Sequence, residues 1–107
     1  MSESQPATTN QAADLRAKNN WLTSFGRNEA SKAGEDGVLE KIFSILGVEK
    51  GWAVEFGAWD GKHLSNTWHL LVNRGWSGVM IEADPIRFSA CRERFKTNPS
   101  VHCFNHF

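Results

Sequence analysis

The stretch that decides the fold is WAVEFGAWDG, residues 52–61. It begins as a short apolar segment, reaches an acid at Glu55 and breaks into a turn that carries two glycines. In α/β proteins, a strand followed by a glycine turn and a helix holds nucleotide-like ligands at the backbone N–H groups of the helix N-terminus. We therefore expect a strand at residues 52–56 and a helix from about residue 62 to residue 74, directly after the turn.

A further helix is predicted upstream of this stretch. Apolar residues recur on one helical face between Asp36 and Leu46, with Asp36 in the N-cap position and Gly47 in the C-cap position. The ordinary interpretation is a core helix with conventional caps. The alternative, in which Glu35 or Asp36 lines a ligand pocket, has no support from the sequence alone.

Two more strands are predicted downstream. Residues 77–82 contain three apolar residues in a row, which is typical of a parallel strand covered on both faces. A helix follows, which Asp84 can cap and Pro85 can open. Its inward side chains are expected to be Ile86, Phe88, Cys91 and Phe95. A third strand begins over residues 101–104, so the element order predicts an α/β fold, a Rossmann-like parallel sheet with flanking helices and right-handed crossovers.

Length and composition limit the remaining possibilities. A chain of 107 residues forms one domain, which we place at residues 21–107, whereas the polar residues 1–20 are expected to be a disordered tail. Twelve basic residues balance twelve acidic ones, so neither nucleic acid nor a membrane surface is an expected partner. The absence of a signal sequence or spanning segment and the presence of only two cysteines fit the cytoplasm best.

The residue types around the turn favour a positively charged ligand. Glu82 lies 21 residues after Gly61 and suits the hydroxyl groups of a ribose. Trp59 occupies the position where a dinucleotide fingerprint needs glycine, and the carboxylates of Glu55 and Asp60 would repel a pyrophosphate. A ligand with an ammonium and a sulfonium group, S-adenosylmethionine, fits this pattern better than a nicotinamide dinucleotide.

These residues also carry a family resemblance. Residues 54–61, VEFGAWDG, resemble the first motif of class I S-adenosylmethionine-dependent methyltransferases, and residues 75–85, GWSGVMIEADP, resemble the second motif of the FkbM-type group. The segments GEDGVL, residues 34–39, and LSNT, residues 64–67, are similar to that group as well. The resemblance extends over roughly residues 31–105 and is more specific than a lone glycine turn.

The resemblance implies a cofactor, S-adenosylmethionine, and an assignment of site residues. Glu55 would lie near the methionine amino group, Glu82 would hold the ribose hydroxyls and Ala83 would border the adenine. The methionine and ribose would be surrounded by the turn residues Gly57, Ala58, Trp59, Asp60 and Gly61. The implied reaction is methyl transfer, with O-methylation of a small molecule or sugar as the expected case, and no catalytic residue is identified.

The chain supplies about three strands, fewer than the complete fold of this family, so we expect a truncated methyltransferase whose exposed sheet edges favour self-association. Two alternatives remain open. One is a non-catalytic remnant that binds a nucleoside or a partner chain, and the other is a fragment of a nicotinamide-dependent oxidoreductase. No metal site is expected, since the potential ligands lack the paired spacing of a zinc site: Cys91, His102, Cys103 and His106.

Overall fold

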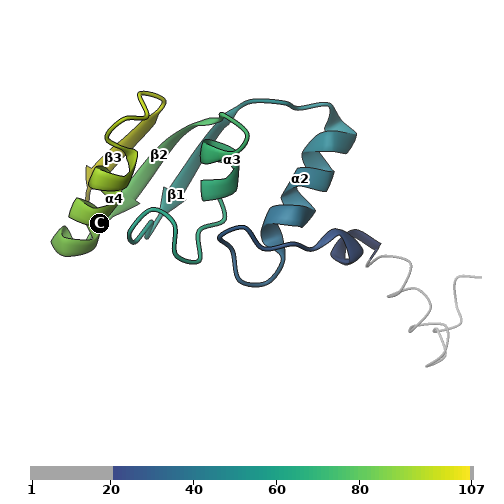
Figure 1. Ribbon diagram of the computed structural model, residues 1–107, viewed down its shortest axis with the longest axis horizontal. Helices are drawn as coiled ribbons and strands as arrows, with labels where there is room; N and C mark the ends of the chain where they lie inside the picture. The colour runs from purple at the N-terminus through teal and green to yellow at the C-terminus, as the bar shows by residue number, and fades with distance from the viewer. Residues whose placement is uncertain (1–20, 107) are drawn as a thin grey trace, which may run out of the picture.

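A three-stranded parallel sheet forms the centre of the computed structural model, which describes residues 21–106 (Figure 1). The tail predicted at residues 1–20 and the last residue lie outside the described residues. The strands follow one another across the sheet in chain order: β1 (Trp52–Phe56), β2 (Ser77–Glu82) and β3 (Val101–Asn105). All three strand predictions are confirmed, and the described residues form a small α/β structure.

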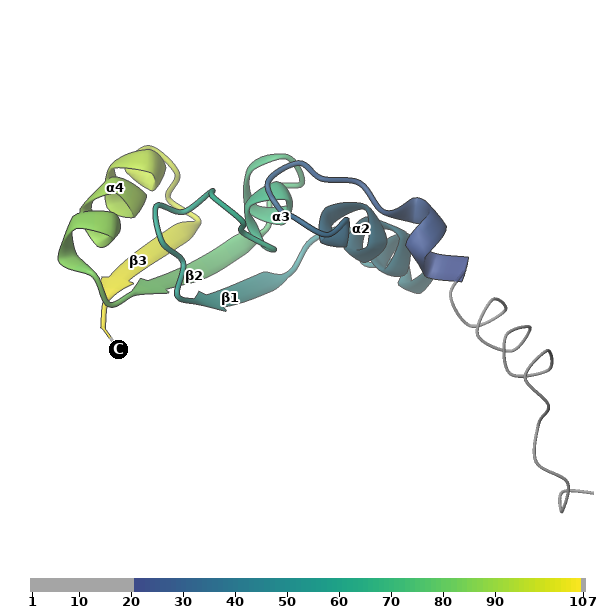
Figure 2. The ribbon, with the colours of Figure 1, turned by 90° about the horizontal axis from the view of Figure 1, so that it is seen from below.

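The helices alternate with the strands. In the described part of the chain they are the 3₁₀ helix η1 (Trp21–Phe25) and the α-helices α2 (Glu35–Leu46), α3 (Trp68–Val72) and α4 (Pro85–Phe95). Figure 2 shows that α3 and α4, which connect successive strands, lie on the same face of the sheet. None of the helices within residues 21–106 is long and apolar enough to cross a membrane.

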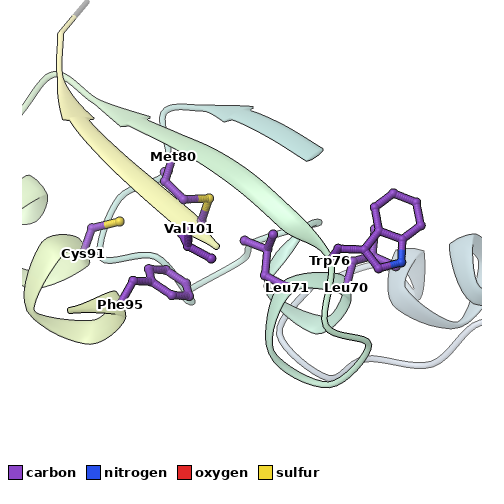
Figure 3. Packing of buried hydrophobic residues seen from close by; sticks show 8 residues of the cluster. Leu70, Leu71, Trp76, Met80, Cys91, Phe95 and Val101 are labelled. Carbon is purple, nitrogen blue, oxygen red and sulfur yellow. The ribbon is translucent and has the colours of Figure 1, made fainter. Parts of the chain in front are cut away.

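The hydrophobic core lies between this pair of helices and the sheet (Figure 3). Its buried members are Ala58, Leu70, Leu71, Trp76, Met80, Cys91, Phe95 and Val101. The layers are in close contact at Gly78 of β2, where an added Cβ would lie 2.4 Å from a methyl carbon of Leu71. The small residue therefore lets α3 pack directly on the central strand.

No helix of residues 21–106 covers the opposite face of the sheet. Side chains on this face belong to alternate residues of each strand, as the parallel register requires. We call it the open face, and its residues are Trp52, Val54, Phe56, Ser77, Val79, Ile81, His102 and Phe104. The prediction that β2 is covered on both faces is therefore wrong, because only the helix-side residues Gly78 and Met80 are buried.

Helix α2 confirms the upstream helix prediction and differs from it at the N-terminus. Gly47 ends the helix in a left-handed conformation as expected, but Gly34 occupies the N-cap position and Asp36 lies inside the first turn. Asp36 Oδ2 instead accepts hydrogen bonds from the preceding loop, with donors at 2.8–2.9 Å: the N–H groups of Glu29, Ala30 and Ser31 and the hydroxyl of Ser31. This buried carboxylate fixes the loop and does not cap its own helix.

Two other helix predictions need correction. The helix expected over residues 62–74 is wrong in extent, since α3 contains only Trp68–Val72 and turns occupy the segment before it. Helix α4 begins as predicted, with Pro85 as its first residue and the Asp84 carboxylate accepting the Arg87 N–H at 2.8 Å. Ile86, however, points to solvent with 81% of its surface exposed, because its spacing from the buried Cys91 and Phe95 puts it on a different side of the helix.

Asp36 makes the stability of the fold sensitive to acid. Burial raises the pKa of Asp36, but its hydrogen bonds to Ala30, Ser31 and Glu29 outweigh burial and bring the pKa below the ordinary value of 3.8. A carboxyl group whose pKa is lower in the folded state stabilises the fold above its unfolded pKa, and this contribution is lost as the pH falls. Asp36→Asn should therefore lower the free energy of unfolding at pH 7 by about 2 kcal/mol and by less at pH 3.

Urea unfolding of both proteins at the two pH values measures this difference. Glu93→Gln, which changes an exposed acid paired only with Lys96 on the surface of α4, serves as the matched control and should change little at either pH. An equal loss of stability in Asp36→Asn at pH 7 and pH 3 would show that the charge of the Asp36 carboxylate does not stabilise the fold.

The two cysteines lie side by side between α4 and β3. Their Sγ atoms are 3.7 Å apart, and both are free thiols. Burial, with a further contribution from Cys103, raises the pKa of Cys91 to about 12. Because the thiolate is the reactive form, iodoacetamide at pH 8 should modify Cys91 in the native protein on the order of a thousandfold more slowly than in the unfolded protein.

Mass spectrometry of peptides from the alkylated wild-type protein distinguishes Cys91 from Cys103 and gives this rate directly. The same protein unfolded in guanidinium chloride provides the reference rate. Rapid modification of Cys91 in the folded protein would mean that this thiol is not enclosed between α4 and the sheet.

Candidate functional site

The candidate site lies where β1 and β2 end. Parallel pairing places Phe56 opposite Ile81, so the loop after β1 and the loop after β2 leave the sheet at the same edge. The carboxyl edge of a parallel sheet is where α/β proteins bind ligands. The turn at residues 57–61 and the acid Glu82 therefore meet, as the sequence predicted.

The turn has three residues with positive φ: Gly57 at 66°, Trp59 at 57° and Gly61 at 88°. The two glycines differ in their surroundings. A Cβ on Gly57 would meet no atom within 4 Å, whereas a Cβ on Gly61 would lie 2.6 Å from a ring carbon of Phe95. Gly61 is therefore required for packing against α4, and Gly57 leaves open space at the outer side of the turn.

Glu55 organises the loop that follows the turn. Its Oε1 atom accepts four hydrogen bonds at 2.9–3.2 Å, from the hydroxyls of Ser65 and Thr67 and the N–H groups of Asn66 and Thr67. These donors hold residues 65–67 in a non-helical conformation, and Ser65 Oγ then accepts the N–H of Trp68 at the start of α3. The helix begins later than predicted because the N–H groups of Asn66 and Thr67 donate to Glu55 and not to helical carbonyl groups.

Asp60 fixes the near end of the same loop. Its Oδ1 accepts the N–H groups of Lys62 and His63 at 3.0 and 2.8 Å, and its carbonyl oxygen accepts Arg94 Nε–H at 2.9 Å. Burial raises the pKa of Asp60, but these backbone bonds and the charge of Arg94 outweigh it, so the pKa lies below 3.8. Asp60 is therefore ionised at neutral pH, with part of its charge offset by Arg94.

Glu82 joins the two loops at the edge of the sheet. Its Oε1 accepts the N–H of Trp59 at 2.6 Å, and its Oε2 accepts the N–H of Asp84 at 2.8 Å. A carboxylate has about four lone-pair sites, so about two remain after these bonds. The carboxylate is held firmly and can still accept hydroxyl groups.

The remaining predicted site residues take different positions. The side chain of Ala58 is buried in the core and its N–H donates to the Ile81 carbonyl at 3.0 Å, so only its backbone faces the turn. Ala83 is exposed after β2, and its carbonyl accepts the side-chain amide of Asn105 at 2.9 Å. The structure thus brings Gly57–Gly61, Glu82 and Ala83 together, whereas Glu55, two residues before the turn on β1, contacts the loop at residues 65–67.

Three residues that contact the predicted site residues were not predicted from the sequence: Arg87, Ser65 and Thr67. The Arg87 guanidinium lies 3.9 Å from the centroid of the Trp59 ring, and the ring of His63 meets Trp59 edge-on at 5.3 Å. Cation–π contact of this kind holds an exposed indole in place. Ser65 and Thr67 bind Glu55 from below, and the hydroxyl residues just downstream of the turn were the available signal for them.

Hollows in the surface do not all coincide with this edge. An open cleft of about 290 Å³ borders the turn, lined by Ala30, Asp60, Lys62, His63, Leu64 and Arg94. A larger hollow of about 620 Å³ lies between α2 and α3, away from the turn. One of the two acids that line it, Glu40, is already paired with Arg27, His69 and Arg74. No group of three or more potential ligands within residues 21–106 could hold a metal ion.

The contrast between the two turn glycines gives a stability prediction. Gly61→Ala should lower the free energy of unfolding by about 2–5 kcal/mol, because the methyl group overlaps Phe95 in addition to the strain of a positive φ. Gly57→Ala carries only the conformational strain and should cost about 1–2 kcal/mol. Urea unfolding of the two variants tests this order, and equal losses would contradict the packing described for Gly61.

Comparisons with protein-family models, with curated proteins and with solved structures find no match to this chain. Its own residues and geometry therefore carry the functional interpretation.

Proposed function

We propose that the carboxyl edge of the sheet is the cofactor-binding part of an S-adenosylmethionine-dependent methyltransferase of FkbM type with a Rossmann-like fold. One observation carries the proposal: the Glu82 carboxylate is anchored across the turn by the Trp59 N–H at 2.6 Å and keeps lone pairs for two neighbouring hydroxyls. Ribose presents such a pair of hydroxyls, and the adenine would then lie beside Ala83.

The charges at this edge support a cationic ligand. Glu55 Oε1 is occupied by its four donors, and Oε2 accepts none of those bonds, so it can face an ammonium group. Asp60 is ionised and lies on the other side of the turn. Two fixed carboxylates favour a ligand with ammonium and sulfonium groups over a pyrophosphate.

The chemistry required of these residues is mainly positioning. When bound, the sulfonium supplies an activated methyl group that needs little acid–base assistance. The chain's own contribution is to hold the ribose at Glu82, to orient the amino group at Glu55 and to present the open side of Gly57 to the ligand. The methyl acceptor in this proposal is a small molecule or sugar hydroxyl, and the free thiols of Cys91 and Cys103 agree with action in the cytoplasm.

A second candidate is a non-catalytic remnant of the same fold that binds a nucleoside. The small size of the sheet favours it, because residues 21–106 form only three strands and place α3 and α4 on a single face. Both candidates require nucleoside binding at Glu82, and only the first requires methyl transfer.

Calorimetry with S-adenosylhomocysteine tests the proposal. Wild-type protein should bind, and Glu82→Ala should weaken binding at least about tenfold, because two charge-assisted hydrogen bonds to hydroxyls are lost. Glu93→Ala on the outer surface of α4 is the matched control and should bind like wild type. Circular dichroism of each variant separates loss of binding from loss of fold.

The outcomes separate the candidates. Absence of binding by folded wild-type protein would overturn both. Binding without methyl transfer to any tested hydroxyl acceptor would support the second candidate, the non-catalytic remnant. Stronger binding of a nicotinamide dinucleotide than of S-adenosylhomocysteine would replace both with the oxidoreductase alternative.

A further inference from the structure

The open face is a continuous apolar surface across all three strands. Register pairs place Val54 next to Val79 and Val79 next to His102 in one row, with Phe56, Ile81 and Phe104 forming the next. Trp52 extends this surface, because its ring stacks parallel to that of His102 with centroids 6.1 Å apart. Figure 2 shows no helix beneath this face in the described chain.

We propose that the open face is a dimerisation surface on which a second copy of this chain places its own open face. The first argument is its area. Exposed fractions are 77% for Phe56, 65% for Trp52 and 53% for Phe104. Since an aromatic side chain presents roughly 150–250 Å², these three residues alone expose on the order of 400 Å² per copy.

Such a surface is large for one that stays in water. Apolar patches of a few hundred Å² mark interaction sites on soluble proteins. Two copies in contact, with the neighbouring valines, isoleucine and histidine included, would bury roughly 1,000 Å² or more in total, which reaches the lower range of specific interfaces. The area therefore suffices for a dimer.

Charge favours an identical partner. None of the open-face residues is Asp, Glu, Lys or Arg, although the chain carries twelve acidic and twelve basic residues. A second copy therefore brings no like charges into contact when the two faces meet around a two-fold axis. A partner that recognised this face through charge would find no complementary group on it.

Geometry favours face-to-face contact over pairing of strand edges. Two sheets pack about 10 Å apart with their strands inclined by about 30°, which lets rows of side chains such as Val54 and Phe56 interdigitate. Contact between the two open faces buries the apolar surface of both copies and leaves no open face for a third copy. Edge pairing at β1 or β3 would leave the face in water and could continue without limit.

Sedimentation velocity and light scattering of the purified chain across a range of micromolar concentrations test the proposal. Wild-type protein should have twice the 12.0 kDa mass of the chain and dissociate on dilution. Val54→Lys and Phe56→Lys each place a charge within the open face, on β1, and should weaken dimerisation at least about a hundredfold. Both residues are exposed in a single copy, so the variants should remain folded.

Ile86→Lys is the matched control. It makes the same kind of change at a more exposed apolar residue, on α4 and away from the open face, and should leave the dimer intact. A monomeric wild-type protein at every concentration, a dimer that both face variants preserve, or assemblies larger than two copies would each overturn the proposal. Circular dichroism confirms that a monomeric variant is folded.

Discussion

A right-handed crossover between parallel strands places its connecting helix on a face that depends on the direction in which the chain moves across the sheet. Here the chain moves the same way twice, from β1 to β2 and then to β3, so α3 and α4 cover one face together. That constraint creates the core between helices and sheet. It also leaves the other face without a helix from the described part of the chain, and the parallel strands bring the loops after β1 and β2 to a common edge.

Acidic side chains then fix the loops at their positions. Asp36, Glu55, Asp60 and Glu82 each accept backbone N–H groups from a segment that has no strand or helix partner. Such bonds satisfy buried or half-buried donors that would otherwise cost free energy. Three of these carboxylates, those of Glu55, Asp60 and Glu82, also form the negative edge of the proposed cofactor site, so binding and loop structure there depend on the same groups.

The sequence predicted the strands and their order because parallel strands are short apolar runs, and it predicted the caps at Gly47 and Asp84 from local chemistry. It failed where distant groups compete with local patterns. The spacing of Leu64, Trp68 and Leu71 suits a helix, yet hydrogen bonds to Glu55 keep the chain before Trp68 out of helical conformation.

The edge of the candidate site was also predictable, since acids at the ends of neighbouring parallel strands must meet. The positions of individual side chains were not. Burial of Ala58, the contact of Arg87 with Trp59 and the exposure of Ile86 depend on how α4 lies against the turn. The exposure of the open face could not be predicted for a related reason. The apolar run in β2 is compatible with a strand covered on one face and with a strand covered on both.

Because each strand pairs only with its neighbour in the chain, the sheet can be assembled one strand at a time. The two crossovers, residues 57–76 and 83–100, are of similar length, so closing either one costs similar chain entropy. Within residues 21–106, strand β2 pairs with both of the others, whereas β1 and β3 each pair with β2 alone. Strand addition can therefore follow the direction of synthesis, with the β1–β2 unit formed before β3 leaves the ribosome.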